Sequence, residues 1–292
     1  EAMGYPIQCI GVPKTVDNDL PGTDTCPGFG SVAKYIAVAT REAGLDVASM
    51  AETSTRVFIL ETMGRHAGWI AAASALARDH EEAPPHVILL PEVALDEARF
   101  LERVRACVER IGYCVVVVSE GLRTADGRFV ADQGTRDAFG HAQLGGVAPA
   151  IAAMVRERLG YKYHYAIADY LQRAARHIAS ATDVEQAHAL GRAAVEFAVA
   201  GHNAVMPTIV RDADAPYRWH IGQVPLADVA NREARMPAEY IDADNLFVTE
   251  AALRYLRPLI AGEDYPPYRD GLPEHVHLRA ERVAPRCPPF RD

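Results

Sequence analysis

A short polar segment near the start of the chain holds the residues best suited to chemistry. Lys14, Thr15, Asp17 and Asp19 lie within six residues and follow an apolar run, 7–12, which predicts a buried strand. Ligands bind outside the carboxyl ends of parallel strands in α/β proteins, so a polar cluster at this point could form an active site. In an extended segment Thr15, Asp17 and Asp19 would lie on one side. Thr15 and Asp17 could then face one ligand together.

Two further strand ends carry groups that suit a phosphorylated sugar. Met63, Gly64 and Arg65 follow a short apolar strand, 57–60. Glycine lets a ligand approach the backbone closely, and free N–H groups at the start of the next helix, together with the arginine, could bind a phosphate. Glu120 follows another strand, where a carboxylate could accept hydrogen bonds from sugar hydroxyls.

A fourth cluster contains cations and an aromatic ring. Tyr170 and Arg173 lie close together in the sequence, and Arg176 and His177 follow. Arginine suits phosphate because its hydrogen bonds are charge-assisted. Each cluster also has a plain structural explanation: a turn at 15–19, a solvated arginine, a cap, or an exposed helix face. Four such clusters at successive strand ends favour an active site.

The composition limits the class of protein. The chain of 292 residues has 30 Lys and Arg against 39 Asp and Glu, a net charge of −9, which argues against a nucleic-acid partner. Its 5 cysteines are odd in number and widely spaced, without a zinc pattern, so reduced thiols in a cytoplasmic protein are expected. The apolar runs are too short or too polar to span a membrane.

The alternation of helix and strand patterns predicts an α/β fold. Short apolar or β-branched runs indicate strands, and apolar residues at helical spacing indicate helices. The predicted strands are 7–12, 57–60, 87–90, 114–118 and 203–210, and the predicted helices are 28–44, 67–80, 96–111, 147–159, 182–200 and 246–260. Strands separated by helices imply parallel βαβ units and a doubly wound sheet.

Three segments of the sequence carry further local signals. The helix 182–200 opens with a sequence of capping-box form that begins at Thr182. The segment 123–146, rich in Gly, Asp and Gln, is either a loop at the edge of the active site or an inserted excursion. The Pro-rich segment 262–292 is not expected to form a core of its own and should run over the surface.

Five motifs together resemble the phosphofructokinase family, in particular its pyrophosphate-dependent branch. They are PKTVDND at 13–19, GTD at 22–24, MGR at 63–65 with Gly68, Glu120, and YLQR at 170–173. The resemblance covers about 7–260 and implies a phosphofructokinase-like α/β fold with two doubly wound parallel-sheet domains, the first of them incomplete. The implied division is a donor-side domain at 1–36 and 173–235, a sugar-phosphate-binding domain at 37–172, and a C-terminal helix and tail at 236–292.

The resemblance also implies a reaction. Phosphoryl transfer from pyrophosphate to the 1-hydroxyl of fructose 6-phosphate would give fructose 1,6-bisphosphate and phosphate, reversibly. By this resemblance Asp17 is the base that accepts the hydroxyl proton. Thr15 binds the reacting end of the sugar phosphate, and Asp19 orients the site or reaches the metal. Lys14 stands where ATP-using members commonly have glycine, and its charge can neutralise pyrophosphate.

The acceptor site is implied in the same way. The sugar would be held by Met63, Gly64, Arg65 and Glu120, and its 6-phosphate by Tyr170 and Arg173. Arg56 matches an arginine that reaches the site of a neighbouring subunit, so a homodimer or homotetramer is implied. Either Lys162 or His164 stands in the place of a second cation of this kind.

One part of the family pattern has no counterpart in this sequence. The family's glycine-rich donor loop includes a Gly-Gly-Asp element whose aspartate helps to bind Mg²⁺, and no Gly-Gly-Asp occurs here. We therefore expect an N-terminally truncated chain that holds no metal ligand of its own, whose Mg²⁺ ligand lies upstream, and whose activity is weak or absent.

Two other functions stay open. One is an ATP-dependent 6-phosphofructokinase, and the other is a non-catalytic regulatory or structural member of the family. The intact Asp17, Arg65 and Glu120 argue against the second. Sedoheptulose 7-phosphate is open as a further acceptor.

Overall fold

A four-stranded parallel sheet lies at the centre of the computed structural model, which describes residues 7–136, 142–144, 146–284 and 286. Its strand order is β2-β3-β1-β6. The strands are β1 (Val57–Thr62), β2 (Val87–Leu89), β3 (Cys114–Ser119) and β6 (Tyr163–Ile167). The β-branched run in β3 is fully buried, as expected of a strand covered on both faces.

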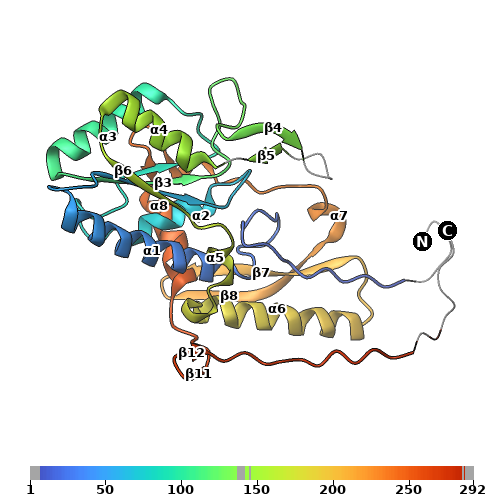
Figure 1. The fold of residues 1–292 in the computed structure, drawn as a ribbon. Helices are drawn as coiled ribbons and strands as arrows, with labels where there is room; N and C mark the ends of the chain where they lie inside the picture. Colours follow the sequence, from blue (N-terminus) through green and yellow to red (C-terminus); the bar gives the residue numbers. More distant parts are fainter. Residues whose placement is uncertain (1–6, 137–141, 145, 285, 287–292) are drawn as a thin grey trace.

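Helices cover both faces of this sheet (Figure 1). One face packs against α3 (Glu97–Ile111) and α4 (Val147–Leu159), and the other against α1 (Phe29–Met50), α2 (Trp69–Ala73) and α8 (Glu250–Leu256). Alternate residues of β3 pack into the hydrophobic cores on opposite faces of the sheet. Val116 and Val118 face α3 and α4, whereas Val117 faces α1. The expected doubly wound α/β architecture is therefore confirmed.

The helix α6 (Ala181–Val199) ties the start of α1 to the rest of the molecule. Its N-cap is Ser180, whose hydroxyl accepts the N–H of Asp183, so the capping box predicted at Thr182 is wrong by two residues. The Asp183 carboxylate accepts the N–H groups of Gly28 at 2.8 Å and Ser31 at 3.1 Å. It thus caps α1 from a neighbouring element.

A second sheet lies below α1, beside α6 (Figure 1). It is an antiparallel hairpin of β7 (Val205–Asp214) and β8 (Tyr217–Pro225). The strand predicted at 203–210 is confirmed as part of β7, whereas β8 was not expected.

The buried strand predicted at 7–12 is wrong. Only Ile10 bridges Val205 of β7, while Ile7 is 60% and Val12 is 52% exposed. Among the described residues, backbone bonds tie this segment to the start of β7 and not to a second strand. Because the segment pairs with β7 only, some of its apolar side chains, such as Ile7 and Val12, stay exposed to solvent.

Other boundaries differ for local reasons. The helix predicted at 67–80 consists of α2 and a 3₁₀ turn, η1 (Ser74–Ala77). The helix predicted at 246–260 consists of α8 followed by η4 (Arg257–Ile260), because Pro258 has no N–H to continue the α-helical pattern. The edge strand β6 was missed because its residues are mostly exposed and do not alternate.

The remaining elements between β3 and the C-terminal tail are short. They are β4 (Asp132–Arg136), β5 (Ala142–Leu144), α5 (Asp169–Ala174), η2 (Arg176–Ile178), α7 (Leu226–Val229), η3 (Ala238–Tyr240), β9 (Ile241–Asp242) and β10 (Phe247–Val248). The segment 123–146 contains the antiparallel pair β4 and β5. The expected division into domains stays a prediction.

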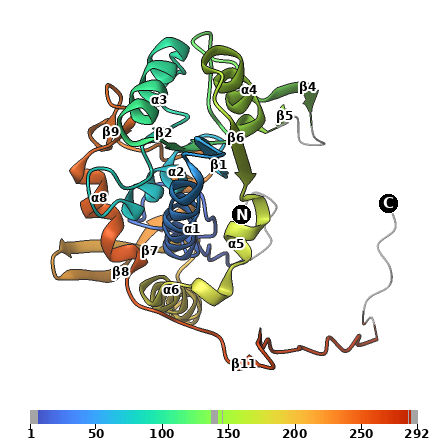
Figure 2. The same cartoon turned by 60° about the vertical axis from the view of Figure 1, so that its left-hand side comes forward.

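The C-terminal tail passes below α6, and its last described part extends away from the body of the molecule (Figures 1 and 2). It contains a small pair of strands, β11 (Tyr268–Arg269) and β12 (Leu272–Pro273), and beyond them Val276 and Leu278 are exposed. Residues 285 and 287–292 lie outside the described part. Among the described helices, none combines the length and apolar character needed to cross a membrane.

We predict that Asp183→Ala lowers the free energy of unfolding of the complete protein by about 2–4 kcal/mol, because it leaves partly buried N–H groups at the start of α1 without an acceptor. Urea denaturation followed by circular dichroism measures this change. Glu185→Ala, at an exposed position of the same helix, is the control and should change stability by less than about 0.5 kcal/mol. Equal effects of the two substitutions would contradict the capping role.

Candidate active site

The loop 13–26 is held in place by the buried amide of Asn18. Its Oδ1 accepts the N–H of Cys26 at 2.9 Å, and its Nδ2 donates to the hydroxyl of Tyr255 at 2.8 Å. Asn18 has a φ of 59°, a left-handed conformation that asparagine tolerates better than most residues. The segment therefore turns at 16–17 and is not extended. The turn interpretation of 15–19 is confirmed, and the extended geometry predicted for it is wrong.

The turn nevertheless brings Thr15 and Asp17 together. The Thr15 hydroxyl donates to Asp17 Oδ2 at 3.2 Å, and the Asp17 N–H donates to Thr15 Oγ1 at 3.1 Å. Both residues are half-buried, and Lys14 beside them is exposed. The turn itself, rather than strand alternation, places the hydroxyl and the carboxylate side by side.

The Asp17 carboxyl of this loop lies close enough to Glu120, which follows β3, for its charge to act on Glu120. Burial raises the pKa of Glu120, hydrogen bonding to Gly64 and the charge of Arg65 lower it, and the charge of Asp17 raises it. Burial also raises the pKa of Asp19, and the charge of Asp17 raises it further. The charges of Arg65, Asp17 and Glu61 therefore act on Glu120 at the carboxyl ends of β1 and β3.

The backbone at 63–65 is shaped by close contacts. Gly64 has a φ of 125°, and a Cβ there would lie 2.6 Å from the carbonyl oxygen of Ala67. A Cβ on Gly121 would lie 2.1 Å from the carbonyl oxygen of Arg65, so the two strand ends pack backbone to backbone. The N–H of Gly64 donates to Glu120 Oε1 at 3.3 Å. In this structure that N–H therefore orients the carboxylate rather than being free for a phosphate.

The segment 169–173 is anchored by a residue that sequence reasoning missed. Gln172 is buried; it accepts the N–H of Met63 at 3.4 Å and donates to the carbonyl oxygen of Asp169 at 2.9 Å. Tyr170 and Arg173 are exposed, and the guanidinium carbon of Arg173 lies 4.0 Å from the centre of the Tyr170 ring. Gln172 thus ties this pair to the strand end that carries the MGR motif.

Arg56 lies at the other end of β1. A six-residue strand spans about 20 Å, so Arg56 is remote from the carboxyl ends of the sheet. Two further polar groups accompany it: Lys162 donates to Ser54 Oγ at 2.8 Å, and His164 Nδ1 lies 2.7 Å from Thr55 Oγ1. The choice between Lys162 and His164 as the second cation stays open.

A buried ion pair fixes the far end of the loop. Asp24 accepts Nε of Arg211 at 2.9 and 3.1 Å, and both side chains are 14% exposed. The Arg211 guanidinium lies over the rings of Tyr217 and Tyr255, at 4.8 and 4.5 Å from their centres. The Tyr255 hydroxyl donates to the carbonyl oxygen of Asp24 at 2.6 Å. Asp24 and Arg211 lie 187 residues apart, so no local sequence pattern predicts this ion pair.

Two more residues near the site were also missed. His66 Nδ1 lies 2.6 Å from Glu233 Oε1, and the charges of both affect the pKa of Asp19. Glu92 is largely buried, and Oε1 accepts the N–H groups of Gly68 at 2.9 Å and Met236 at 3.2 Å. Burial raises the pKa of Glu92.

Comparison with known proteins shows the family of this chain. The phosphofructokinase family model matches residues 1–198. The chain is 66% identical to the pyrophosphate–fructose 6-phosphate 1-phosphotransferase of Methylococcus capsulatus, covering 95% of this chain and 66% of that protein. It is 60% identical to the enzyme of the same name from Halomonas elongata, covering 100% of this chain and 70% of that protein.

A solved structure gives the same result. The pyrophosphate-dependent phosphofructokinase of Nitrosospira multiformis matches with a TM-score of 0.90 and 58% identity, covering 99% of this chain and 69% of that one. The chain thus spans about two thirds of the length of these relatives. The expected fold and family are confirmed: this chain belongs to the phosphofructokinase family.

Proposed function

We propose that this chain is the part of a pyrophosphate-dependent 6-phosphofructokinase that binds and activates the sugar phosphate. The reaction transfers a phosphoryl group from pyrophosphate to the 1-hydroxyl of fructose 6-phosphate, giving fructose 1,6-bisphosphate and phosphate, and runs in both directions. The observation that carries the proposal is the Thr15–Asp17 pair, held beside Arg65 and Glu120 with Lys14 exposed next to it. The names of the most similar relatives support the same donor and acceptor.

Asp17 is proposed as the general base. Its Oδ2 accepts the Thr15 hydroxyl, and Oδ1 has no donor among the described residues. Oδ1 is therefore the oxygen available to take the proton of the 1-hydroxyl. Thr15 fixes the carboxylate and lies next to the reacting end of the sugar. Because phosphoryl transfer needs positioning more than covalent chemistry, this rigid pair suits the task.

The acceptor is proposed to lie between Arg65, Glu120 and the segment 170–173. Arg65 forms no ion pair with any described residue, so its charge is available to a ligand. The Glu120 carboxylate suits sugar hydroxyls, and Met63 and Gly64 form the backbone wall beside it. Tyr170 and Arg173 are proposed to bind the 6-phosphate, where an exposed guanidinium forms charge-assisted hydrogen bonds.

Lys14 and Asp19 are proposed to interact with the phosphoryl donor and its metal ion. Lys14 is exposed and offers a mobile point charge to pyrophosphate. The mutual repulsion of Asp17 and Asp19 fits a nearby cation, and carboxylate oxygens are ligands that Mg²⁺ prefers. Bound Mg²⁺ would neutralise charge on the donor oxygens. Asp19 is the described residue best placed to orient it.

A homodimer or homotetramer is part of the proposal. Arg56 lies with Lys162 and His164 at the sheet end opposite the site, where it cannot serve the Asp17 of its own chain. It is proposed to reach the acceptor site of a neighbouring copy. A cytoplasmic location is likewise proposed. Sedoheptulose 7-phosphate is a second phosphoryl acceptor to test in the activity assay with pyrophosphate.

We predict that Asp17→Asn lowers kcat by about 10²–10⁴-fold in the complete protein, since it removes the proton acceptor. Affinity for fructose 6-phosphate, measured by calorimetry, should stay within about threefold because the side chain keeps its shape. Asp46→Asn, at an exposed position on α1, is the control and should leave both values unchanged. Loss of sugar-phosphate binding with unchanged kcat would make Asp17 a structural residue instead.

A second prediction concerns the donor. Lys14→Gly should lower pyrophosphate-dependent turnover by about 10²-fold, because it removes a charge that acts on the transferred group. Lys14→Arg, which keeps the charge, should retain more activity than the glycine variant. Steady-state kinetics with pyrophosphate as the varied substrate provides both values. Full turnover of Lys14→Gly would contradict the donor assignment.

A further inference from the structure

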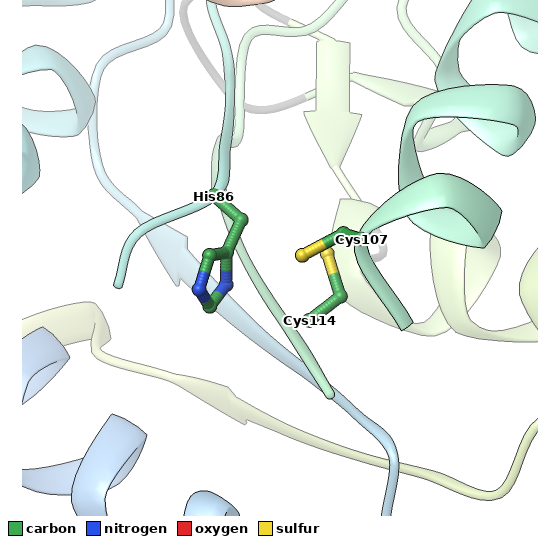
Figure 3. A group of neighbouring side chains, drawn as sticks. All are labelled: His86, Cys107 and Cys114. Carbon is green, nitrogen blue, oxygen red and sulfur yellow. The ribbon is translucent and has the colours of Figure 1, made fainter. Parts of the chain in front are cut away.

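Three buried side chains outside the active site lie together at the amino end of β3. His86 precedes β2, Cys107 lies in the last two turns of α3, and Cys114 begins β3. One imidazole nitrogen and the two sulfur atoms lie within 4.8 Å of one another. Figure 3 shows the two cysteine side chains pointing toward each other with the imidazole beside them. By ligand type alone, this cluster suits zinc.

The hydrogen bonds of His86 argue against a metal. Its Nδ1 accepts the N–H of Val115 at 2.8 Å, so the ring proton lies on Nε2, which donates to the carbonyl oxygen of Glu82 at 3.1 Å. A neutral imidazole that binds a metal through one nitrogen carries its proton on the other. His86 could ligate a metal only by giving up a bond to the backbone. The cluster is therefore better described as a pair of thiols.

The two thiols are not equivalent. The pKa of Cys107 is lowered, first by the Cys114 thiol beside it and also by the positive charge of Arg110. The pKa of Cys114 is raised by its coupling to Cys107 and by its complete burial. In its protonated form Cys107 donates to the carbonyl oxygen of Tyr113 at 3.2 Å. Of the two, Cys107 is the nucleophile and Cys114 the proton donor.

Cys107 also has access to solvent through a cationic pocket. It lines an open pocket of about 320 Å³, together with Arg78, Arg103, Arg110 and one acidic residue, Glu81. Cys114 does not line it. Three guanidiniums against one carboxylate favour the thiolate form of Cys107, the only cysteine in the described part of the chain that lines this pocket. A small oxidant can therefore reach Cys107 and not Cys114.

We propose that Cys107 and Cys114 form a dithiol site that hydrogen peroxide oxidises to a disulfide. The Cys107 thiolate attacks one peroxide oxygen, the O–O bond breaks, and hydroxide leaves and is protonated to water. Cys107 is then a sulfenic acid. The Cys114 sulfur attacks the Cys107 sulfur, the S–O bond breaks, and the oxygen leaves as water with the Cys114 proton. Two thiols lose two electrons in total, and one peroxide becomes two waters.

Other described cysteines lack this combination. Cys26 is buried, and burial raises its pKa to about 12, so its thiol is inert. Cys9 is exposed, and no other cysteine forms a cluster with it in the described part of the chain. The paired arrangement at the start of β3 is thus distinct, and Cys9 serves as an internal control.

The test exposes the complete protein to hydrogen peroxide, alkylates the remaining free thiols and maps the peptides by mass spectrometry. An intramolecular Cys107–Cys114 disulfide is expected. Cys107→Ser should abolish it, and Cys114→Ser should leave a sulfenic acid on Cys107 that dimedone traps. Cys9→Ser should change neither product. Circular dichroism verifies that each variant is folded.

A second pair of variants tests the role of the pocket. Arg110→Gln should slow the oxidation of Cys107 by at least about threefold, whereas Arg105→Gln on the same helix should not. Each of the two arginines pairs with a glutamate, Arg110 with Glu81 and Arg105 with Glu102, but of the two only Arg110 lines the pocket.

Three results would overturn the proposal. The first is the absence of the disulfide after peroxide treatment, and the second is a dimedone label on Cys114 rather than Cys107. The third is one equivalent of zinc in the purified protein that is lost in both serine variants, because it would make the cluster a metal centre.

Discussion

The buried amide of Asn18 is the contact on which the active-site loop depends. It bonds to the Cys26 N–H and to the Tyr255 hydroxyl, and Tyr255 in turn bonds to the backbone of Asp24. The Asp24–Arg211 ion pair closes this network from β7. Leaving a buried amide unsatisfied costs about 1–3 kcal/mol, so the turn is strongly favoured. The orientation of Thr15 and Asp17 follows from that turn.

The central sheet supplies the other half of the site. Its parallel register aligns Thr62 with Ser119, so the residues that follow β1 and β3 meet at one edge. Close backbone contacts at Gly64 and Gly121 leave no room for side chains there. Asp17, Glu120 and Arg65 therefore lie near one another at this edge of the sheet. Burial raises the pKa values of Asp19 and Glu120, and the charge of Asp17 raises both further.

The sequence predicted those parts of the fold whose signals are local. The continuous β-branched run predicts the strand at 114–118, and apolar residues at helical spacing predict the helix at 147–159. The prediction of a buried strand at 7–12 is wrong, because an apolar run in a sequence does not show how much of it a neighbouring element will cover. The edge strand β6 was missed for the converse reason, since it has one neighbour and little burial.

The site was predicted from motifs, whereas its supports were not. Motif spacing brought out Arg65 and Glu120, which follow β1 and β3, and Asp17, which lies in the loop 13–26. The Gln172–Met63 and Asn18–Tyr255 contacts each span more than 100 residues, which no local pattern encodes. The cluster of His86, Cys107 and Cys114 was not predicted either, because only the fold brings the histidine next to the two cysteines.

The most direct test of the proposed function is a comparison of phosphoryl donors. Initial rates of the complete protein are measured with fructose 6-phosphate and Mg²⁺, with pyrophosphate or ATP as the donor. The account predicts turnover with pyrophosphate at a rate well above that with ATP, and the reverse reaction from fructose 1,6-bisphosphate and phosphate. Turnover with ATP and none with pyrophosphate would contradict it.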